Sequence, residues 1–428
     1  MTRTAPETPA VTTGWTPLGV LATAQFLVVL STSIVNVALP QIRAGLALTD
    51  TSQAWTVNAY VLVFGALLLP GGRAGDVYGL RRVFLLGTAV FALSALGAAL
   101  APSAIALIAF RVTMGIGAAL LAPTGLALVL TLYTGPDRRG TALGVWGAVS
   151  GAGGAAGVLL GGLLTGLYGW RAVFAVIVPL ALAVLVATRL LVGPDRPRGG
   201  SMDAPGTVTV TAGLVALTYG LSGPWPLALA GLVLLGLFTL LQRRSAAPLL
   251  PARMSVVAVP NVLMALLGAV WLGVFYFLPH YQQRVLGYSP LEAGLTQLPL
   301  ALTITLSSWF TGRLPTRRAL PAGLLVLAAG LAWLSRTPAD GTFLMDLLGP
   351  TLLIGAGLGT AFVRLTTTVS TGVPAADSGL AGGLVNATRQ IGGAVGLALL
   401  TLLPTSGAAF LACAALTLLI SALSTRKA

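Results

Sequence analysis

Residues 71–84 read GGRAGDVYGLRRVF and separate two long apolar runs, at 53–73 and 83–101. The stretch carries four charged residues in a chain of 428 residues that is only 8% charged and 56% hydrophobic. A soluble globular domain carries about 25% charged residues. The composition therefore indicates an integral membrane protein, and the stretch is a short polar connection between two membrane-spanning helices.

The same alternation of apolar runs and short polar connections continues along the chain. A helix needs about twenty mainly apolar residues to cross a bilayer, and the runs predict fourteen spans. Cytoplasmic loops collect Lys and Arg. With both termini cytoplasmic, most of the 24 basic residues fall on the inner side, and only Arg43, Arg171, Arg284 and Arg336 fall in outer loops. The net charge of +14 therefore reflects loop anchors rather than nucleic-acid binding.

An internal repeat at an offset of 240 residues divides the chain into two related halves. Gly115 matches Gly355, and Asp137 matches Asp377. Transporters are often built from such repeats. We therefore expect an all-α polytopic membrane protein with two six-helix bundles and two inserted helices. The expected parts are a cytoplasmic tail (1–16), an N-terminal bundle (17–192), a linker (193–205), the inserted spans (206–242), a linker (243–259), a C-terminal bundle (260–424) and a tail (425–428).

Several stretches resemble the major facilitator superfamily, and within it the fourteen-span drug:proton antiporter branch. The stretch 71–84 is similar to the family's loop motif, and STSIVNVALP (31–40), RVTMGIGAAL (111–120) and VNATRQIGGAVG (385–396) are similar to signatures of its spans. The resemblance implies a major facilitator fold in the plasma membrane. It also implies proton-coupled efflux of small hydrophobic or amphiphilic compounds, of the drug or antibiotic type, by alternating access.

The resemblance further implies a gating role for the loop motif. In the family, the loop acid meets the cytoplasmic start of the span equivalent to 378–403, where free backbone N–H groups favour a negative charge. Asp377 stands at that start in this chain. We expect a latch between the bundles, and a solvated hairpin is the alternative. The latch residues are Gly72, Asp76, Gly79, Arg81, Arg82 and Asp377.

Glycines recur every three or four positions along the span predicted at 140–166, which predicts a glycine face on one side of a helix. Such a face lets a neighbouring helix approach closely. The region resembles the family's antiporter motif, although Val158 replaces its proline. Plain helix packing is the alternative to a role in coupling. The set is Gly147, Gly151, Gly154, Gly157, Gly161 and Gly162.

The first span lacks the acid that this branch of the family carries, and Ser31 stands in its place. Glu292 and Asp346, both near the outer surface, are the nearest substitutes. Arg111 and Arg389 lie inside spans, where ionisable residues are functional candidates. These arginines either pair with helix carbonyls and amide side chains or bias the cavity towards anions. We expect neutral or anionic amphiphiles as substrates, with an uncoupled facilitator as the alternative to an antiporter.

Polar and aromatic residues of the spans are candidates for lining a substrate cavity. They are Gln25, Asn36, Asn58, Tyr60, Trp271, Tyr276, Gln297, Asn386 and Gln390. One His and one Cys, without a clustered acid, base and nucleophile, argue against an enzyme, a metal site and a cofactor. The expected partners are a small-molecule substrate and the lipid bilayer, without nucleic acid or an obligate protein. A non-transporting scaffold or sensor is the alternative from another functional class.

Overall fold

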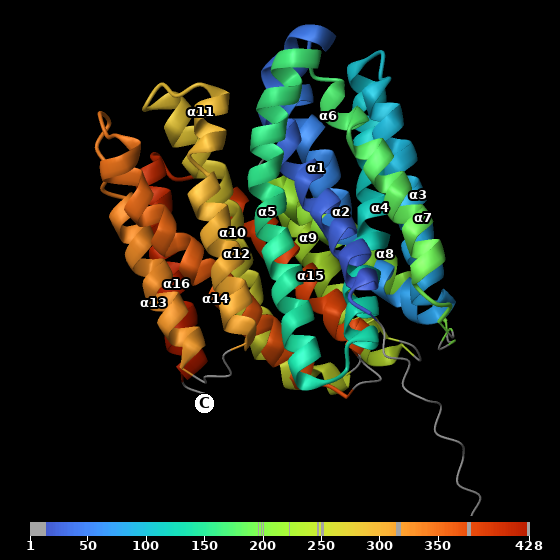
Figure 1. Ribbon diagram of the computed structural model, residues 1–428. Helices are drawn as coiled ribbons and strands as arrows, with labels where there is room; N and C mark the ends of the chain where they lie inside the picture. Colours follow the sequence, from blue (N-terminus) through green and yellow to red (C-terminus); the bar gives the residue numbers. More distant parts are fainter. Residues whose placement is uncertain are drawn as a thin grey trace, which may run out of the picture.

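A computed structural model describes residues 14–195, 197, 199, 201–221, 223–245, 248–249, 252–313, 318–374 and 378–425. These residues form long helices joined by short connections (Figure 1). The α-helices are α1 Thr16–Leu46, α2 Asp50–Tyr78, α3 Leu80–Ala99, α4 Ala104–Leu132, α5 Pro136–Tyr168, α6 Ala172–Ala175, α7 Ile177–Leu191, α8 Ala204–Leu221, α9 Trp225–Arg244, α10 Ala258–Arg284, α11 Pro290–Leu295, α12 Leu298–Arg313, α13 Ala319–Leu334, α14 Leu348–Thr371, α15 Ser378–Leu400 and α16 Ser406–Thr425. A 3-10 turn (Ala252–Val257) precedes α10, and a π-helical turn (Phe343–Leu347) precedes α14.

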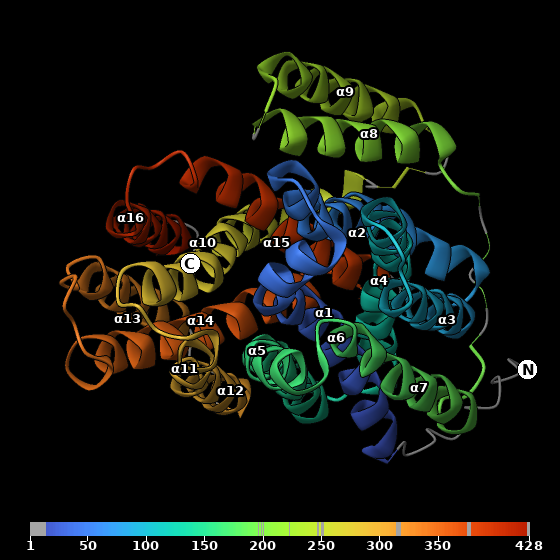
Figure 2. The same ribbon diagram turned by 90° about the horizontal axis from the view of Figure 1, so that it is seen from above.

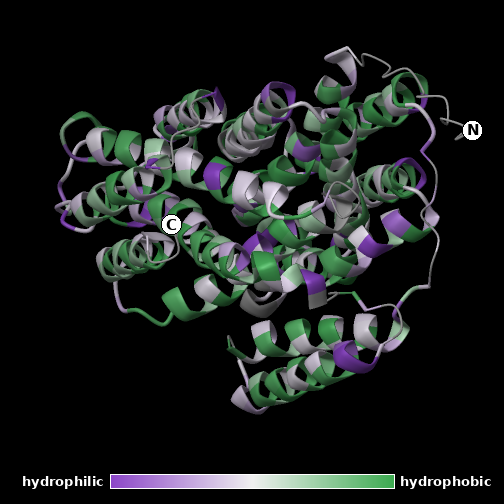
Figure 3. Cartoon of the chain, turned by 90° about the horizontal axis from the view of Figure 1, so that it is seen from below, coloured by the Kyte–Doolittle hydropathy of each residue, from purple (hydrophilic) through white to green (hydrophobic). Residues whose placement is uncertain are grey.

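Eleven helical segments of the described residues are long and apolar enough to cross a membrane. They comprise α1 to α5, the joined α6 and α7, α8, α9, α10, α14 and α16, whereas α12, α13 and α15 are helical but outside this set. Hydrophilic residues are sparse along the helices when these are coloured by hydropathy (Figure 3). A helix satisfies its backbone polar groups internally, as the interior of a bilayer demands. The sequence prediction of an all-helical, multi-pass chain is therefore confirmed.

Three of the predicted spans contain a break or an irregular turn. The run at 172–192 divides at Val176 into α6 and α7, and the π-helical turn opens the run at 344–372. The run at 291–312 divides into α11, a six-residue helix, and the apolar helix α12. Ser289 and Glu292 form a capping box that fixes the start of α11. The predicted linker 243–259 contains the 3-10 turn, and α10 begins within it at Ala258.

The helices before α8 pack mainly on one another, and so do those from α10 onward (Figure 2). In the first half, α1 packs on α5 and α4 packs on α2 and α3. In the second half, α10 packs on α15 and α14 packs on α12 and α13. The halves meet along two lines, which we call the α5–α12 seam and the α2–α15 seam. The pair α8 and α9 lies outside both halves, with α8 against α2 and α15 (Figure 2).

Candidate functional site

At the α2–α15 seam, Gly72 and Gly383 face each other near the end of α2. A Cβ atom built on Gly72 would lie 3.7 Å from the Cα of Gly383 and 3.7 Å from the Cβ of Pro123. A Cβ on Gly382 would lie 3.2 Å from Leu126 of the other half. A Cβ would fit at Gly72 in ordinary contact, whereas at Gly382 it would require Leu126 to shift by a few tenths of an ångström. The loop-motif residue Gly72 therefore lies at a contact between the two halves.

The remaining loop-motif residues lie around the turn from α2 to α3. Gly79 adopts φ +101°, a conformation that L-residues rarely adopt, and it ends α2 and begins α3. Asp76 is buried, with 7% of its surface exposed, whereas Arg82 is exposed. Asp377 lies outside the described residues. The latch between Asp76 and the start of α15 thus stays a prediction.

A linker residue that the sequence reasoning missed fixes this turn. The carboxylate of Asp195 accepts hydrogen bonds from the backbone N–H of Leu80 and from that of Arg81, the latter at 3.0 Å. The guanidinium of Arg81 in turn donates to the carbonyl oxygen of Arg189 at 2.8 Å. A carboxylate at a helix N-terminus satisfies free N–H groups and complements the helix dipole. The only sequence signal was an Asp in a linker, which does not reveal the distant helix start it caps.

The glycines of α5 contact two different neighbours, whereas the glycine face was expected to meet one. Gly157 packs against Ser33 of α1, and a Cβ on Gly161 would lie 2.9 Å from the carbonyl oxygen of Ile34. The other four point to helices of the second half. Those contacts are Gly147 to Phe362, Gly151 to Ile304, Gly154 to Phe275 and Gly162 to Leu291. The physical reason is that α5 lies between α1 and the second half, so both sides need close approach.

Arg111 of α4 is fully buried, with two backbone carbonyls in hydrogen-bond contact, and its Nη2 has no hydrogen-bond partner among the described residues. Its Nε donates to the carbonyl of Thr56 at 2.9 Å, and its Nη1 donates to the carbonyl of Ser31 at 3.4 Å. Its guanidinium carbon lies 4.3 Å from the ring centroid of Tyr60, within cation–π range. The hydroxyl groups of Ser31 and Tyr60 both donate to the carbonyl of Val28. Arg111 therefore follows the alternative in which the buried arginine pairs with helix carbonyls.

Arg389 of α15 has a different environment. Its guanidinium carbon lies 5.9 Å from the Trp271 ring and 5.7 Å from the Phe362 ring, and 8% of the residue is exposed. Its buried Nε has no hydrogen-bond partner among the residues that the structure describes. A buried donor without a partner costs about 1–3 kcal/mol. Arg389 therefore presents a charge and an unused donor beside two aromatic rings, which suits an anionic or electron-rich ligand.

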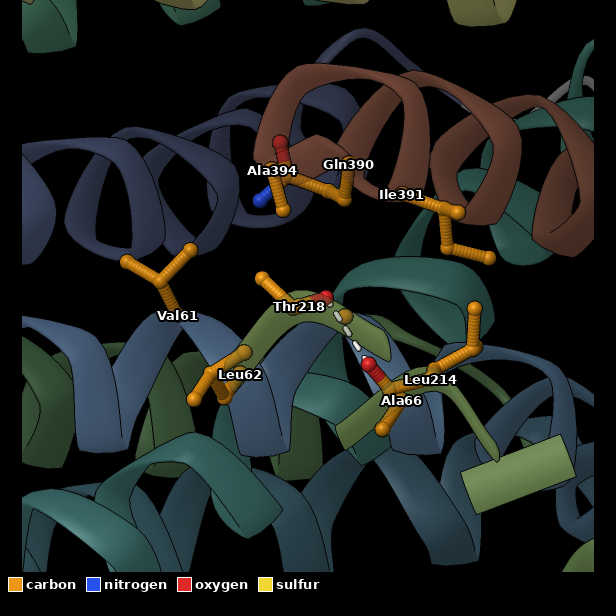
Figure 4. Close-up of a pocket in the computed structure, with 9 residues that line it drawn as sticks. Val61, Leu62, Ala66, Leu214, Thr218, Gln390, Ile391 and Ala394 are labelled. Atoms are coloured by element: carbon orange, nitrogen blue, oxygen red, sulfur yellow. Dashed lines mark hydrogen bonds between the residues drawn. The ribbon is translucent and has the colours of Figure 1, made fainter. Parts of the chain in front are cut away.

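The cavity candidates divide into buried and exposed groups. Gln25 (1% exposed), Tyr60, Trp271, Gln297 and Asn386 are buried, Gln390 is half-buried, and Asn36, Asn58 and Tyr276 are exposed. Within the described part of the chain, three of these candidates have a buried polar atom without a partner: Gln25 Oε1, Gln297 Oε1 and Asn386 Nδ2. Gln390 lines a cavity of about 10 Å³ between α2, α8 and α15 (Figure 4). The predicted set is thus spread over both halves, and three of its buried members hold a polar atom without a partner among the described residues.

Glu292 lies in the first turn of α11 and is exposed. Its carboxylate accepts hydrogen bonds from the N–H and the hydroxyl of Ser289, both at 2.8 Å. These bonds hold the pKa of Glu292 below its ordinary value. The residue is therefore ionised at neutral pH, and its observed role is to cap a helix.

Comparison with known proteins adds to this geometry. The sequence profile of the Major Facilitator Superfamily matches residues 21–397. The "Cephamycin export protein CmcT" of Amycolatopsis lactamdurans is 42% identical over 423 residues, covering 94% of this chain and 87% of that protein. The "Puromycin resistance protein pur8" of Streptomyces alboniger is 41% identical over 419 residues, covering 93% of this chain and 83% of that protein.

Solved structures agree in fold. The human organic anion transporter MFSD10 (TETRAN) superposes with a TM-score of 0.73 at 17% identity, covering 98% of this chain and 100% of that one. The proton:xylose symporter XylE superposes with a TM-score of 0.70 at 15% identity, covering 96% and 95%. The arrangement of helices in two halves, the profile match and these relatives all indicate the same family. The chain therefore belongs to the Major Facilitator Superfamily, as a multi-pass membrane transport protein rather than an enzyme, with antibiotic export and resistance proteins among its relatives.

Proposed function

We propose that this protein exports small hydrophobic or amphiphilic compounds of the antibiotic type across the plasma membrane by alternating access. The observation that carries the proposal is the pair of seams at which the two halves meet through glycine. Contacts such as Gly72 with Gly383 and Gly140 with Gly312 bring backbone close to backbone. Rocking of one half against the other then costs little steric repacking. The 42% identity to a cephamycin export protein supports the direction of transport.

The proposed topology has fourteen spans with both termini in the cytoplasm. It adds α12, α13 and α15 to the eleven helical segments that are long and apolar enough by themselves. The N-terminal bundle comprises 17–192, the inserted pair 206–242 and the C-terminal bundle 260–424. Residues such as Arg81 and Arg313 then fall on the cytoplasmic side, where basic residues collect.

Arg389 is the proposed anchor for the substrate. Its unpartnered Nε and the flanking rings of Trp271 and Phe362 offer a cation, a hydrogen-bond donor and apolar surface together. A buried cation is costly without a compensating group. We therefore propose neutral or anionic amphiphiles as the substrates.

Proton antiport is the proposed energy source, with the proton as coupling ion and no bound cofactor. One charge moving across 100 mV supplies about 2.3 kcal/mol, which sustains roughly fifty-fold accumulation. An uncoupled facilitator is the second candidate, and the Ser31 site favours it. There the hydroxyl donates to the Val28 carbonyl and the backbone carbonyl accepts from Arg111, so the position holds no titratable acid.

The test uses the purified full chain in proteoliposomes with an imposed pH gradient. Flux of a β-lactam or puromycin-type compound should follow the gradient and collapse when a protonophore removes it. Flux that persists unchanged without the gradient would contradict proton antiport and would support the uncoupled facilitator. Arg389→Gln should lower transport of anionic compounds more than of cationic ones, and Arg336→Gln, an exposed arginine, is the matched control. Equal loss for both charge classes would contradict the proposed anchor.

A further inference from the structure

The two seams differ in what lies over them. At the α2–α15 seam, α8 packs on both helices, and the hydroxyl of Thr211 donates to the carbonyl of Ala66 at 3.4 Å. The space left there is the cavity of about 10 Å³ (Figure 4). At the α5–α12 seam, a groove of about 470 Å³ is open on its outer side. In the part of the chain that the structure describes, protein covers the first seam and leaves a groove along the second.

The groove has apolar walls contributed by both halves. Its residues are Val145, Ala148, Val149 and Ala152 of α5 and Thr305, Leu306, Trp309 and Phe310 of α12. The Thr305 hydroxyl is satisfied within the wall, because it donates to the carbonyl of Ala148 at 3.2 Å. Residues 145 to 152 extend about 10 Å along α5 at 1.5 Å per residue. The groove therefore provides an elongated apolar binding surface that runs along the helices.

One end of the groove carries a positive charge. Arg313 is the last residue of α12 and is exposed, and its guanidinium carbon lies 3.6 Å from the ring centroid of Trp309. The ring thus holds the cation above the apolar bed. Gly140, one turn from the start of α5, lies against Gly312 at the same level. This end is where α1 begins and α16 ends (Figure 1).

We propose that the groove binds an anionic phospholipid, with an acyl chain between α5 and α12 and the headgroup phosphate at Arg313. In the proposed topology both α5 and α12 span the membrane, so lipid acyl chains are the apolar partners that surround this seam. An empty groove would forfeit dispersion contacts along both walls. A planar guanidinium recognises phosphate through two hydrogen bonds. The lipid occupies at this seam the place that α8 occupies at the other.

The groove exists only in this arrangement of the halves, because each half supplies one wall. A lipid held there stabilises this arrangement by its differential affinity for it. The inserted pair and the bound lipid then act on opposite seams of the same rocking motion. The anionic lipid content of the membrane then regulates the equilibrium between this arrangement of the halves and the others.

The test measures thermal unfolding of the detergent-purified full chain during titration with phosphatidylglycerol or phosphatidylcholine. Phosphatidylglycerol should raise the unfolding temperature saturably and at lower concentration. One arginine near a membrane surface contributes about 1 kcal/mol to anionic lipid binding, so Arg313→Gln should weaken the apparent phosphatidylglycerol affinity about five-fold. Arg244→Gln, an exposed arginine at the end of α9, is the matched control and should respond as wild type.

A second measurement places the acyl chain. Phosphatidylglycerol with brominated acyl chains should quench a tryptophan signal that is missing in Trp309→Phe, and Ala148→Phe, which fills the groove, should abolish that quenching. The proposal is overturned if Arg313→Gln keeps the wild-type preference for phosphatidylglycerol. It is equally overturned if Trp309 contributes nothing to the quenching, a result that does not depend on the Ala148→Phe variant folding.

Discussion

Gly140 provides the sharpest test of the proposed alternating access. A Cβ atom at Gly140 would lie 2.7 Å from the carbonyl oxygen of Gly312, across the α5–α12 seam. Ordinary van der Waals contact begins at 3.4 Å, so Gly140→Ala forces a separation of about 0.7 Å between two backbones. Overpacking of this kind costs about 1–3 kcal/mol. The arrangement described here should therefore lose about 5- to 150-fold in population relative to one with the halves apart at this end.

Gly166 offers a matched control on the same helix, because no atom lies within 4 Å of a Cβ built there. Spin labels at the exposed positions Asp137 and Arg313 report the distance across the seam, in a Cys413→Ala background. Double electron–electron resonance should show an additional population at longer distance for Gly140→Ala. It should show no such population for Gly166→Ala. The reasoning is refuted if Gly140→Ala leaves the distribution unchanged or if Gly166→Ala shifts it equally.

Three further outcomes follow from individual contacts. Asp195→Ala removes the carboxylate that caps α3 and should cost about 0.5–2 kcal/mol of stability, seen as a lower unfolding temperature in detergent. Arg111→Lys should yield less folded protein than wild type on size-exclusion chromatography, because an ammonium cannot reach both backbone carbonyls and stack on the ring. Glu292 has a lowered pKa, so its contribution to stability is present above the ordinary value of about 4.3 and is lost as the pH falls through the lowered one. Glu292→Gln should therefore leave the pH profile of transport between about pH 5.5 and 8 unchanged, and a profile that shifts would restore Glu292 as a coupling group.

Patterns that are local in the chain predicted much of the architecture. Run length and the spacing of basic residues marked the helices, since a bilayer demands internal backbone hydrogen bonds and cytoplasmic anchors. The inserted spans predicted at 206–222 and 225–242 correspond closely to α8 and α9. Gly72, expected in the latch, lies at a contact between the two halves, where the missing side chain permits close approach.

The site was less predictable, because its contacts join residues far apart in the chain. Periodicity placed the α5 glycines on one face, yet Gly157 meets α1 while Gly151 meets α12. Arg111 and Arg389 looked equivalent in sequence, but only Arg111 has backbone carbonyls within reach of its guanidinium at both Nε and Nη1.

The sequence by itself determined that this chain is helical, crosses the membrane many times and repeats itself in two halves. Hydropathy, charge and spacing are local patterns over a few residues, so they can be recognised without knowing the tertiary contacts. Only the tertiary structure decided which groups surround each buried arginine, how Asp195 fixes the turn after α2, and which seam is left open. Each of these depends on the atoms that a second helix brings within a few ångströms, and no local pattern contains that information.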